Sequence, residues 1–421
     1  MRTQVYVRTV TIQCADISRV KYLEDTILSK MFVRAAAIFA LLALALTSAA
    51  PARAQGEPAT PDDEMQSVLD ALASLNAPPL YNLAPPSARN VPGPPYWVAT
   101  AAARAGIPAP QEQVGKVQHI TIPGEGGDIL LRVYTPKGDG PFPVVVYFHG
   151  GGWVIANLDA YDPSARALTN ASGAIFVSVN YRQAPEMKYP AATNDAFSAY
   201  KWAIENAGDI NGDPKQVAVA GESAGGNLAT GVSLRARDEG VQMPIHQLLI
   251  YPITNYAFDT ESYQTYADAV PLSKPLMQYF FRNYLPNEAA GDEQYVSPLR
   301  ADSLEGLPPT TMVAAEIDPL TSEGKAYADR LSDSGVSVRY QLYEGLTHEF
   351  FGMGAVVSKA KDAVAFAGEG LRSSFNNPEM PNTGAGGLES RDSRSAGLPF
   401  AALGLALAVP VGLTLRRAAR R

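Results

Sequence analysis

One serine of this 421-residue chain stands in a setting suited to nucleophilic catalysis. Gly221-Glu222-Ser223-Ala224-Gly225 directly follows the apolar run Val217–Ala220 and opens a segment rich in Ala and Leu. A sharp strand-to-helix turn strains the backbone, and glycines flanking the serine leave room for that turn. The serine would then lie at the N-terminus of a helix, whose dipole favours developing negative charge. We therefore predict that Ser223 is a nucleophile in acyl transfer.

A glycine-rich loop earlier in the chain offers a second part of such a site. His149-Gly150-Gly151-Gly152-Trp153 follows the apolar run Val144–Phe148. In acyl transfer the carbonyl oxygen becomes negatively charged, and preset N–H donors stabilise that charge. Because consecutive glycines allow close approach with the amides turned inward, we predict an oxyanion hole formed by the amides of Gly151, Gly152 and Ala224.

A serine hydroxyl also needs a base, and the chain contains four histidines. His119 and His246 begin apolar runs, so we expect structural roles for both. His149 starts the glycine-rich loop and is expected to brace it. The remaining histidine, His348, follows the last predicted strand, where the base of a serine, acid, histidine order belongs. We predict that His348 is the base.

The acid of this order should follow the penultimate strand, and two carboxylates occur there. Asp318 lies just beyond the apolar run that ends at Ala315, whereas Glu316 is closer to the strand and is the weaker candidate. A carboxylate in this place holds the histidine tautomer and stabilises the imidazolium. We predict Asp318 as the acid, with Glu316 as the alternative.

The elements that must position these residues alternate regularly along the chain. Continuous apolar runs of this kind are typical of strands that helices bury on both faces. The alternation predicts an α/β protein with a doubly wound, mostly parallel, eight-stranded sheet. The predicted strands are 119–122, 129–134, 144–148, 175–179, 217–220, 247–251, 311–315 and 336–343. The predicted helices are 65–75, 163–172, 191–206, 225–237, 322–334 and 358–372, with 254–294 as an insertion that breaks the pattern.

Composition excludes several other classes of protein. The formal charge is −8 and the central region has no basic stripe, so a nucleic-acid partner is not expected. No repeat of about 20–50 residues is visible, so a solenoid or propeller is not expected. With 46% hydrophobic residues, the chain can build one large core.

The N-terminal region has the pattern of a secretion signal. Met31–Arg34 supplies a basic start, Ala35–Leu46 an apolar run, and Ala52-Arg53-Ala54 a cleavage site of small residues. We expect export, with translation starting at Met31. The single cysteine, Cys14, lies upstream, so the mature protein would depend on its core for stability.

The C-terminal region predicts attachment outside the cell. Gly397–Leu415 is apolar and precedes four arginines; as a helix it would be about 28 Å long, enough to cross a membrane. Met380-Pro381-Asn382-Thr383-Gly384 resembles the sorting signal that sortases cut between Thr and Gly. Met380 departs from the usual Leu, and the spacer to the apolar segment is long. The alternative is a plain membrane anchor, and both predict a secreted protein anchored to the membrane or cell wall.

Five motifs in order resemble the hormone-sensitive lipase family of α/β-hydrolases. They are His149–Trp153, Tyr181-Arg-x-Ala-Pro-Glu186, Gly221–Gly226, Asp318-Pro-Leu320 and the His348 loop. The resemblance covers roughly residues 115–355 and implies a carboxylesterase with a helical cap that acts on small to medium acyl esters, with no metal or organic cofactor. It also implies Ser223, Asp318 and His348 as the catalytic triad. Glu222 departs from the commoner Asp or Thr, and Gln183 from the usual Leu.

These patterns and the resemblance together predict five regions in the chain. These are a signal region (1–54), a leader with an N-terminal cap (55–110), a catalytic domain (111–375) with a cap insertion at about 254–295, a linker (376–396) and an anchor (397–421). The insertion is rich in Tyr and Phe, for which we expect packing within the cap.

Two other functions fit the same residues. The first is an amidase or deacetylase that uses the same triad. The second is a catalytically inactive protein that binds a ligand in a hydrolase fold. The presence of all three triad residues argues against the second, whereas only kinetics separates the first from an esterase.

Overall fold

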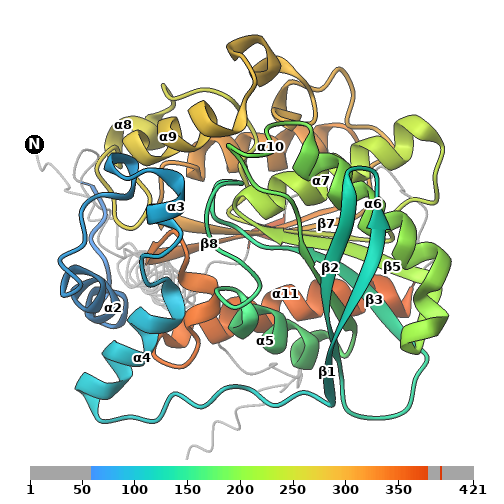
Figure 1. Cartoon of the computed structure of the whole chain (residues 1–421), viewed down its shortest axis with the longest axis horizontal. Helices are drawn as coiled ribbons and strands as arrows, with labels where there is room; N and C mark the ends of the chain where they lie inside the picture. The colour runs from blue at the N-terminus through green and yellow to red at the C-terminus, as the bar shows by residue number, and fades with distance from the viewer. Residues whose placement is uncertain (1–57, 378–388, 391–421) are drawn as a thin grey trace, which may run out of the picture. The chain divides into compact units, whose positions relative to one another are not determined.

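The strands predicted from the sequence form a single sheet (Figure 1). A computed structural model describes residues 58–377 and 389–390. The strands are β1 (Lys116–Gly124), β2 (Gly127–Thr135), β3 (Phe142–Phe148), β4 (Ile175–Asn180), β5 (Gly212–Glu222), β6 (Gln247–Ile250), β7 (Thr310–Ile317) and β8 (Val338–Thr347). A two-residue strand, β9 (Glu389–Ser390), pairs with β8. The eight predicted strands are therefore confirmed.

The sheet is mostly parallel, as predicted. Its order is β1-β2-β4-β3-β5-β6-β7-β8-β9, and only the β1–β2 and β2–β4 pairs are antiparallel. Parallel neighbours bring their carboxyl ends to the same edge, which is where ligands bind in open α/β sheets. The loops that follow β3, β5, β7 and β8 therefore meet at one edge of the sheet.

The helices form layers on both faces of the sheet. They are α2 (Asp63–Ala73), α3 (Pro85–Ala88), α4 (Pro94–Ala105), α5 (Asp162–Ser172), α6 (Ala191–Asn206), α7 (Ala224–Glu239), α8 (Glu261–Thr265), α9 (Lys274–Tyr284), α10 (Thr321–Asp333) and α11 (Ser358–Asn376). All six helices predicted from the sequence are present. Figure 1 shows α5 beside α11, and α6 beside α7.

Strand β3 shows how the two layers arise from residue alternation. Val144, Val146 and Phe148 pack into the core that includes α6 and α7, whereas Val145 and Tyr147 pack into the core that includes α5 and α11. Successive side chains of a strand point to opposite faces, so an unbroken apolar run fills both cores. Each fully buried Val contributes about 1.5–3 kcal/mol of transfer free energy.

Two segments outside the alternating pattern are helical. The insertion contains α8 and α9, and Ser273 caps α9 by accepting from the Leu276 amide. Helix α4 was not among the helices predicted from the sequence, because its proline-rich start reads as a loop. Proline is tolerated in the first turn of a helix, and α4 begins at Pro94 and ends before Gly106 (φ +67°).

The predicted signal region and C-terminal anchor lie outside the described residues. Within residues 58–377, every helix is too short or too polar to cross a membrane.

Candidate active site

The fold brings the three predicted catalytic residues together. The Ser223 Oγ lies 3.0 Å from the His348 Nε2, and the His348 Nδ1 lies 2.6 Å from the Asp318 Oδ2. All three residues are buried. The rival acid, Glu316, instead accepts a hydrogen bond from the Gly345 amide at 2.7 Å. Of the two candidate acids, Asp318 is therefore the one that contacts His348.

Ser223 occupies the sharp turn that the sequence predicts. Its backbone lies at φ +56° and ψ −118°, between the end of β5 and the start of α7. A conformation this rare costs on the order of 1–3 kcal/mol. A Cβ at Gly221 would overlap the Gly225 carbonyl, and a Cβ at Gly225 would overlap the Phe148 carbonyl. Glycine at position 221 therefore lets the turn close, and glycine at position 225 lets it pack against β3.

The amides predicted to form an oxyanion hole are free to donate. Gly151 and Gly152 have φ of +98° and +58°, and both line the same pocket as Ser223. Ala224 is the first residue of α7, where the N–H has no intrahelical acceptor. Within the described part of the chain, none of the three amides donates to a protein acceptor. Three donors are thus available beside the nucleophile, and their catalytic role stays a prediction.

His149 braces the oxyanion loop. Its ring stacks on that of Tyr181 at 4.4 Å between centroids, and its Nδ1 lies 2.8 Å from the Gly150 carbonyl oxygen. The Tyr181 hydroxyl donates to the His149 carbonyl at 2.8 Å. Burial lowers the pKa of His149 to about 4, so the ring is neutral at neutral pH.

The other two histidines also have structural partners. His246 is buried between the hydroxyls of Ser374 and Thr311, and burial lowers its pKa to about 3. His119 accepts a hydrogen bond from the Arg132 Nε at 2.9 Å. Among the four histidines, only His348 lies beside the predicted nucleophile.

The environment of His348 favours the protonated ring. Burial alone would lower its pKa, but Asp318, Glu349 and Glu222 outweigh this and raise the pKa above its ordinary value. A raised pKa means that the ring binds a proton more tightly, which suits His348 to accept the proton of the Ser223 hydroxyl.

The pocket above Ser223 is small and mostly apolar, with a volume of about 100 Å³. The segment before β1 and the insertion both contribute walls. The apolar lining includes Leu80, Ala88, Val91, Trp97, Ile155, Leu272, Leu276 and Phe280. A larger depression of about 590 Å³ between α4, α5 and α11 contains none of the three triad residues.

The pocket walls were not identified from the sequence. Leu276 and Phe280 are spaced four residues apart, which places them on one face of α9, and Leu272 lies just before that helix. That spacing was the available signal. Most other aromatic residues of the insertion pack internally, as expected; Tyr284, for example, stacks on Trp153 at 4.2 Å between centroids.

Comparison with known proteins places the chain among esterases. Residues 145–352 match a family model described as an alpha/beta hydrolase fold. The chain is 40% identical to carboxylesterase NlhH of Mycobacterium tuberculosis over 61% of this chain and 81% of that protein. It is 32% identical to ethyl acetate hydrolase of Pseudomonas putida over 59% and 79%. A solved structure of a thermostable esterase from Pseudomonas putida superposes with a TM-score of 0.69 at 36% identity, covering 76% of this chain and 98% of that chain.

Proposed function

The chain belongs to the esterases of the hormone-sensitive lipase family, which have the α/β-hydrolase fold, and we propose that its triad hydrolyses esters of small to medium acyl groups. Ester hydrolysis as such follows from its relatives, which are carboxylesterases. The observation that carries the finer proposal is the hydrogen-bonded series from Ser223 through His348 to Asp318 at a small apolar pocket.

The first step transfers the acyl group to the enzyme. His348 Nε2 takes the proton of the Ser223 hydroxyl as Oγ attacks the ester carbonyl, and Asp318 stabilises the imidazolium. The amides of Gly151, Gly152 and Ala224 receive the oxyanion, each contributing up to about 3–4 kcal/mol in the transition state. The C–O bond to the alcohol then breaks, and the alcohol leaves with the proton from Nε2.

The second step releases the acid. A water molecule gives a proton to His348 Nε2 and attacks the carbonyl of the acyl-serine. The bond to the Ser223 Oγ breaks, the carboxylic acid leaves, and the Oγ regains its proton from Nε2. The same oxyanion donors serve both steps, because each passes through a tetrahedral intermediate.

The volume of the pocket supports the proposed preference for small to medium acyl groups. Pockets for drug-sized ligands measure about 300–1,000 Å³, whereas this one measures about 100 Å³. Phe280 and Trp97 are among its walls, so a long acyl chain would need them to move. The relative named ethyl acetate hydrolase, whose name specifies a short ester, agrees with this size.

Hydrolysis of p-nitrophenyl esters from acetate to laurate by the full-length chain tests the proposal. We expect the highest kcat/KM at short to medium lengths and no turnover by the Ser223→Ala variant. Activity that rises steadily to laurate would contradict the acyl preference. A folded protein that hydrolyses amides but no ester would favour the amidase alternative.

We also propose that the enzyme acts outside the cytoplasm, anchored to the membrane or cell wall. The support is in the sequence: the signal pattern ending at Ala54, the apolar segment 397–415 with arginines after it, and the sorting-like motif at Thr383-Gly384. Protease treatment of intact expressing cells should remove the activity. Thr383→Ala should block release of the C-terminal peptide if a sortase processes the chain; release that persists would favour the plain anchor.

A further inference from the structure

A second carboxylate lies on the nucleophile side of the catalytic histidine. Glu349 directly follows His348, and its Oε1 lies 3.9 Å from the His348 Nε2. Its side chain is only 15% exposed and lines the same pocket as Ser223. Asp318 contacts the opposite side of the ring, at Nδ1. The imidazole therefore lies between two carboxylates, one beside each nitrogen.

The backbone of Glu349 is held in a strained conformation. Its φ of +71° and ψ of 2° fall in the left-handed region, which few residues other than glycine adopt. Such conformations persist where the surroundings impose them and often mark functional sites. Here the conformation turns the carboxylate toward the pocket rather than toward solvent.

Tyr161 connects Glu349 to the oxyanion loop. The Tyr161 hydroxyl donates to the Glu349 carboxylate, 2.7 and 2.8 Å from its two oxygens, which suits an ionised carboxylate. The same hydroxyl lies against Gly150, where a Cβ would overlap it. One hydroxyl thus touches both the start of the oxyanion loop and the residue after the catalytic histidine.

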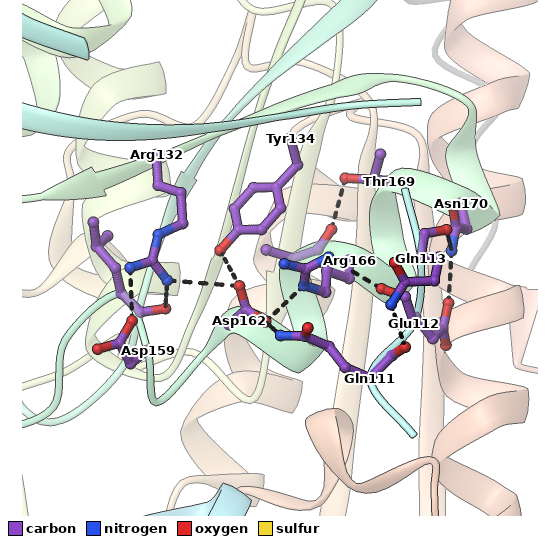
Figure 2. Close-up of polar contacts among 12 residues, drawn as sticks. Gln111, Glu112, Gln113, Arg132, Tyr134, Asp159, Asp162, Arg166, Thr169 and Asn170 are labelled. Carbon is purple, nitrogen blue, oxygen red and sulfur yellow. Dashed lines mark hydrogen bonds and ion pairs between the residues drawn. The ribbon is translucent and has the colours of Figure 1, made fainter. Parts of the chain in front are cut away.

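The residue after Tyr161 is fixed by its own polar network. Asp162 accepts from the Tyr134 hydroxyl at 2.8 Å, the Gln111 amide at 2.6 Å and the Arg166 Nε at 2.7 Å (Figure 2). Tyr134 comes from β2 and Gln111 from the segment before β1, whereas Arg166 lies one turn along α5, so two other elements hold the start of α5. Tyr161 is therefore presented to Glu349 from a rigid support.

Titratable groups from three other elements lie around His348. Asp318 comes from the loop after β7, Glu222 ends β5 and Tyr251 directly follows β6, with its ring centroid 4.4 Å from that of His348. Glu349 is a further carboxylate in these surroundings, and it is the one that faces the Nε2 of His348. Burial raises the pKa of Glu349, while His348 and the Tyr161 hydroxyl favour its charged form.

We propose that Glu349 is a positioning residue of the ester-hydrolysing site. Its carboxylate stabilises the protonated His348 ring from the Nε2 side, and through Tyr161 it sets the distance between the histidine loop and the oxyanion loop. This inference rests on the proposed function. The ring gains positive charge at Nε2 when it accepts the serine proton, so a carboxylate on that side acts in both chemical steps.

NMR titration of the histidine rings in the full-length chain tests the electrostatic part. His149 and His246 have pKa values of about 4 and 3, so neither ring should titrate between pH 5 and 9. The signal that is lost in His348→Gln identifies the His348 ring. Glu349→Gln retains an oxygen for Tyr161 but removes the charge, and we expect it to lower the pKa of His348 by about one pH unit.

Glu205→Gln, on the exposed side of α6, is the matched control and should leave the pKa of His348 unchanged. The acid limb of the kcat/KM profile should move with the ring pKa in Glu349→Gln. An unchanged His348 pKa in a folded Glu349→Gln variant overturns the proposal. The titration reports on Glu349 even if the protein hydrolyses no ester, so it separates this outcome from failure of the proposed function.

Tyr161→Phe tests the link between the loops. It keeps the ring and removes the hydroxyl, and we expect kcat to fall about threefold or more with little change in KM, because the hydrogen bond that holds Glu349 beside the oxyanion loop is lost. A variant with unchanged kcat would overturn this part of the proposal. Thermal unfolding of each variant shows whether the fold is retained.

Discussion

Gly225 in the first turn of α7 packs directly against the carbonyl of Phe148 at the end of β3. The close approach holds the nucleophile turn against the strand that leads into the oxyanion loop. Any side chain at position 225 would force the two apart. Ser223 and the glycine-rich loop after β3 are thus positioned by backbone contact.

Gly225→Ala should destabilise the protein by several kcal/mol, because its Cβ would overlap the backbone carbonyl of Phe148 in the middle of the sheet. Gly231→Ala in the same helix is the control. Its nearest neighbours would lie 3.8 and 3.9 Å away, so the exchange should be neutral or stabilise by about 0.5–1 kcal/mol. Urea unfolding measures both; equal effects would contradict this account of the turn.

Asp318→Asn should lower kcat by about 10⁴-fold, because an amide cannot hold the productive tautomer of His348 or stabilise its charge. Glu316→Gln should change kcat by no more than a few-fold, because Glu316 bonds to the Gly345 amide and not to the histidine. Kinetics on one short p-nitrophenyl ester compares the two. If kcat fell further in Glu316→Gln than in Asp318→Asn, Glu316 and not Asp318 would be the acid.

Phe280→Ala should shift the preferred ester toward longer acyl chains, because Phe280 lines the pocket and abuts Gly152. Phe281→Ala, its neighbour, should destabilise the fold by about 3–5 kcal/mol without shifting the preference, because Phe281 is buried against Trp153. The measurement is the profile of kcat/KM against chain length. A profile that stays fixed in Phe280→Ala would remove Phe280 from the acyl site.

Glu222→Gln should flatten the pH dependence of stability between about pH 4.5 and 7. Burial raises the pKa of Glu222 from 4.5 to about 7, against hydrogen bonds from Tyr147 and Tyr251 at 2.5 Å. The folded protein therefore holds this proton more tightly than the unfolded chain. The stabilisation is present below pH 4.5 and is lost as the pH rises toward 7, an effect of about 3 kcal/mol.

Urea unfolding at several pH values gives this slope for wild type and variant. Glu205→Gln, which removes an exposed carboxylate of α6, should leave the slope as it is in wild type. A slope that is the same in Glu222→Gln and wild type would mean that Glu222 is ionised in the folded protein throughout this range.

Much of the fold and the site could be predicted because the signals are local. A strand buried on both faces is an unbroken apolar run such as Val144–Phe148, and the turn at Ser223 needs glycines two residues away on each side. Chain order then leads to His348 and to two candidate acids. These features depend on neighbours in the sequence, so composition and spacing are enough to find them.

Tertiary structure alone decided the relationships between distant segments. The Tyr161–Glu349 hydrogen bond joins residues 188 positions apart, and the choice of Asp318 over Glu316 depends on where β7 ends relative to the His348 loop. Phe280 lies at the pocket because α9 packs over Gly152. Such contacts result from how helices and loops pack on the finished sheet, and the free energy of that packing is not encoded in any short stretch of residues.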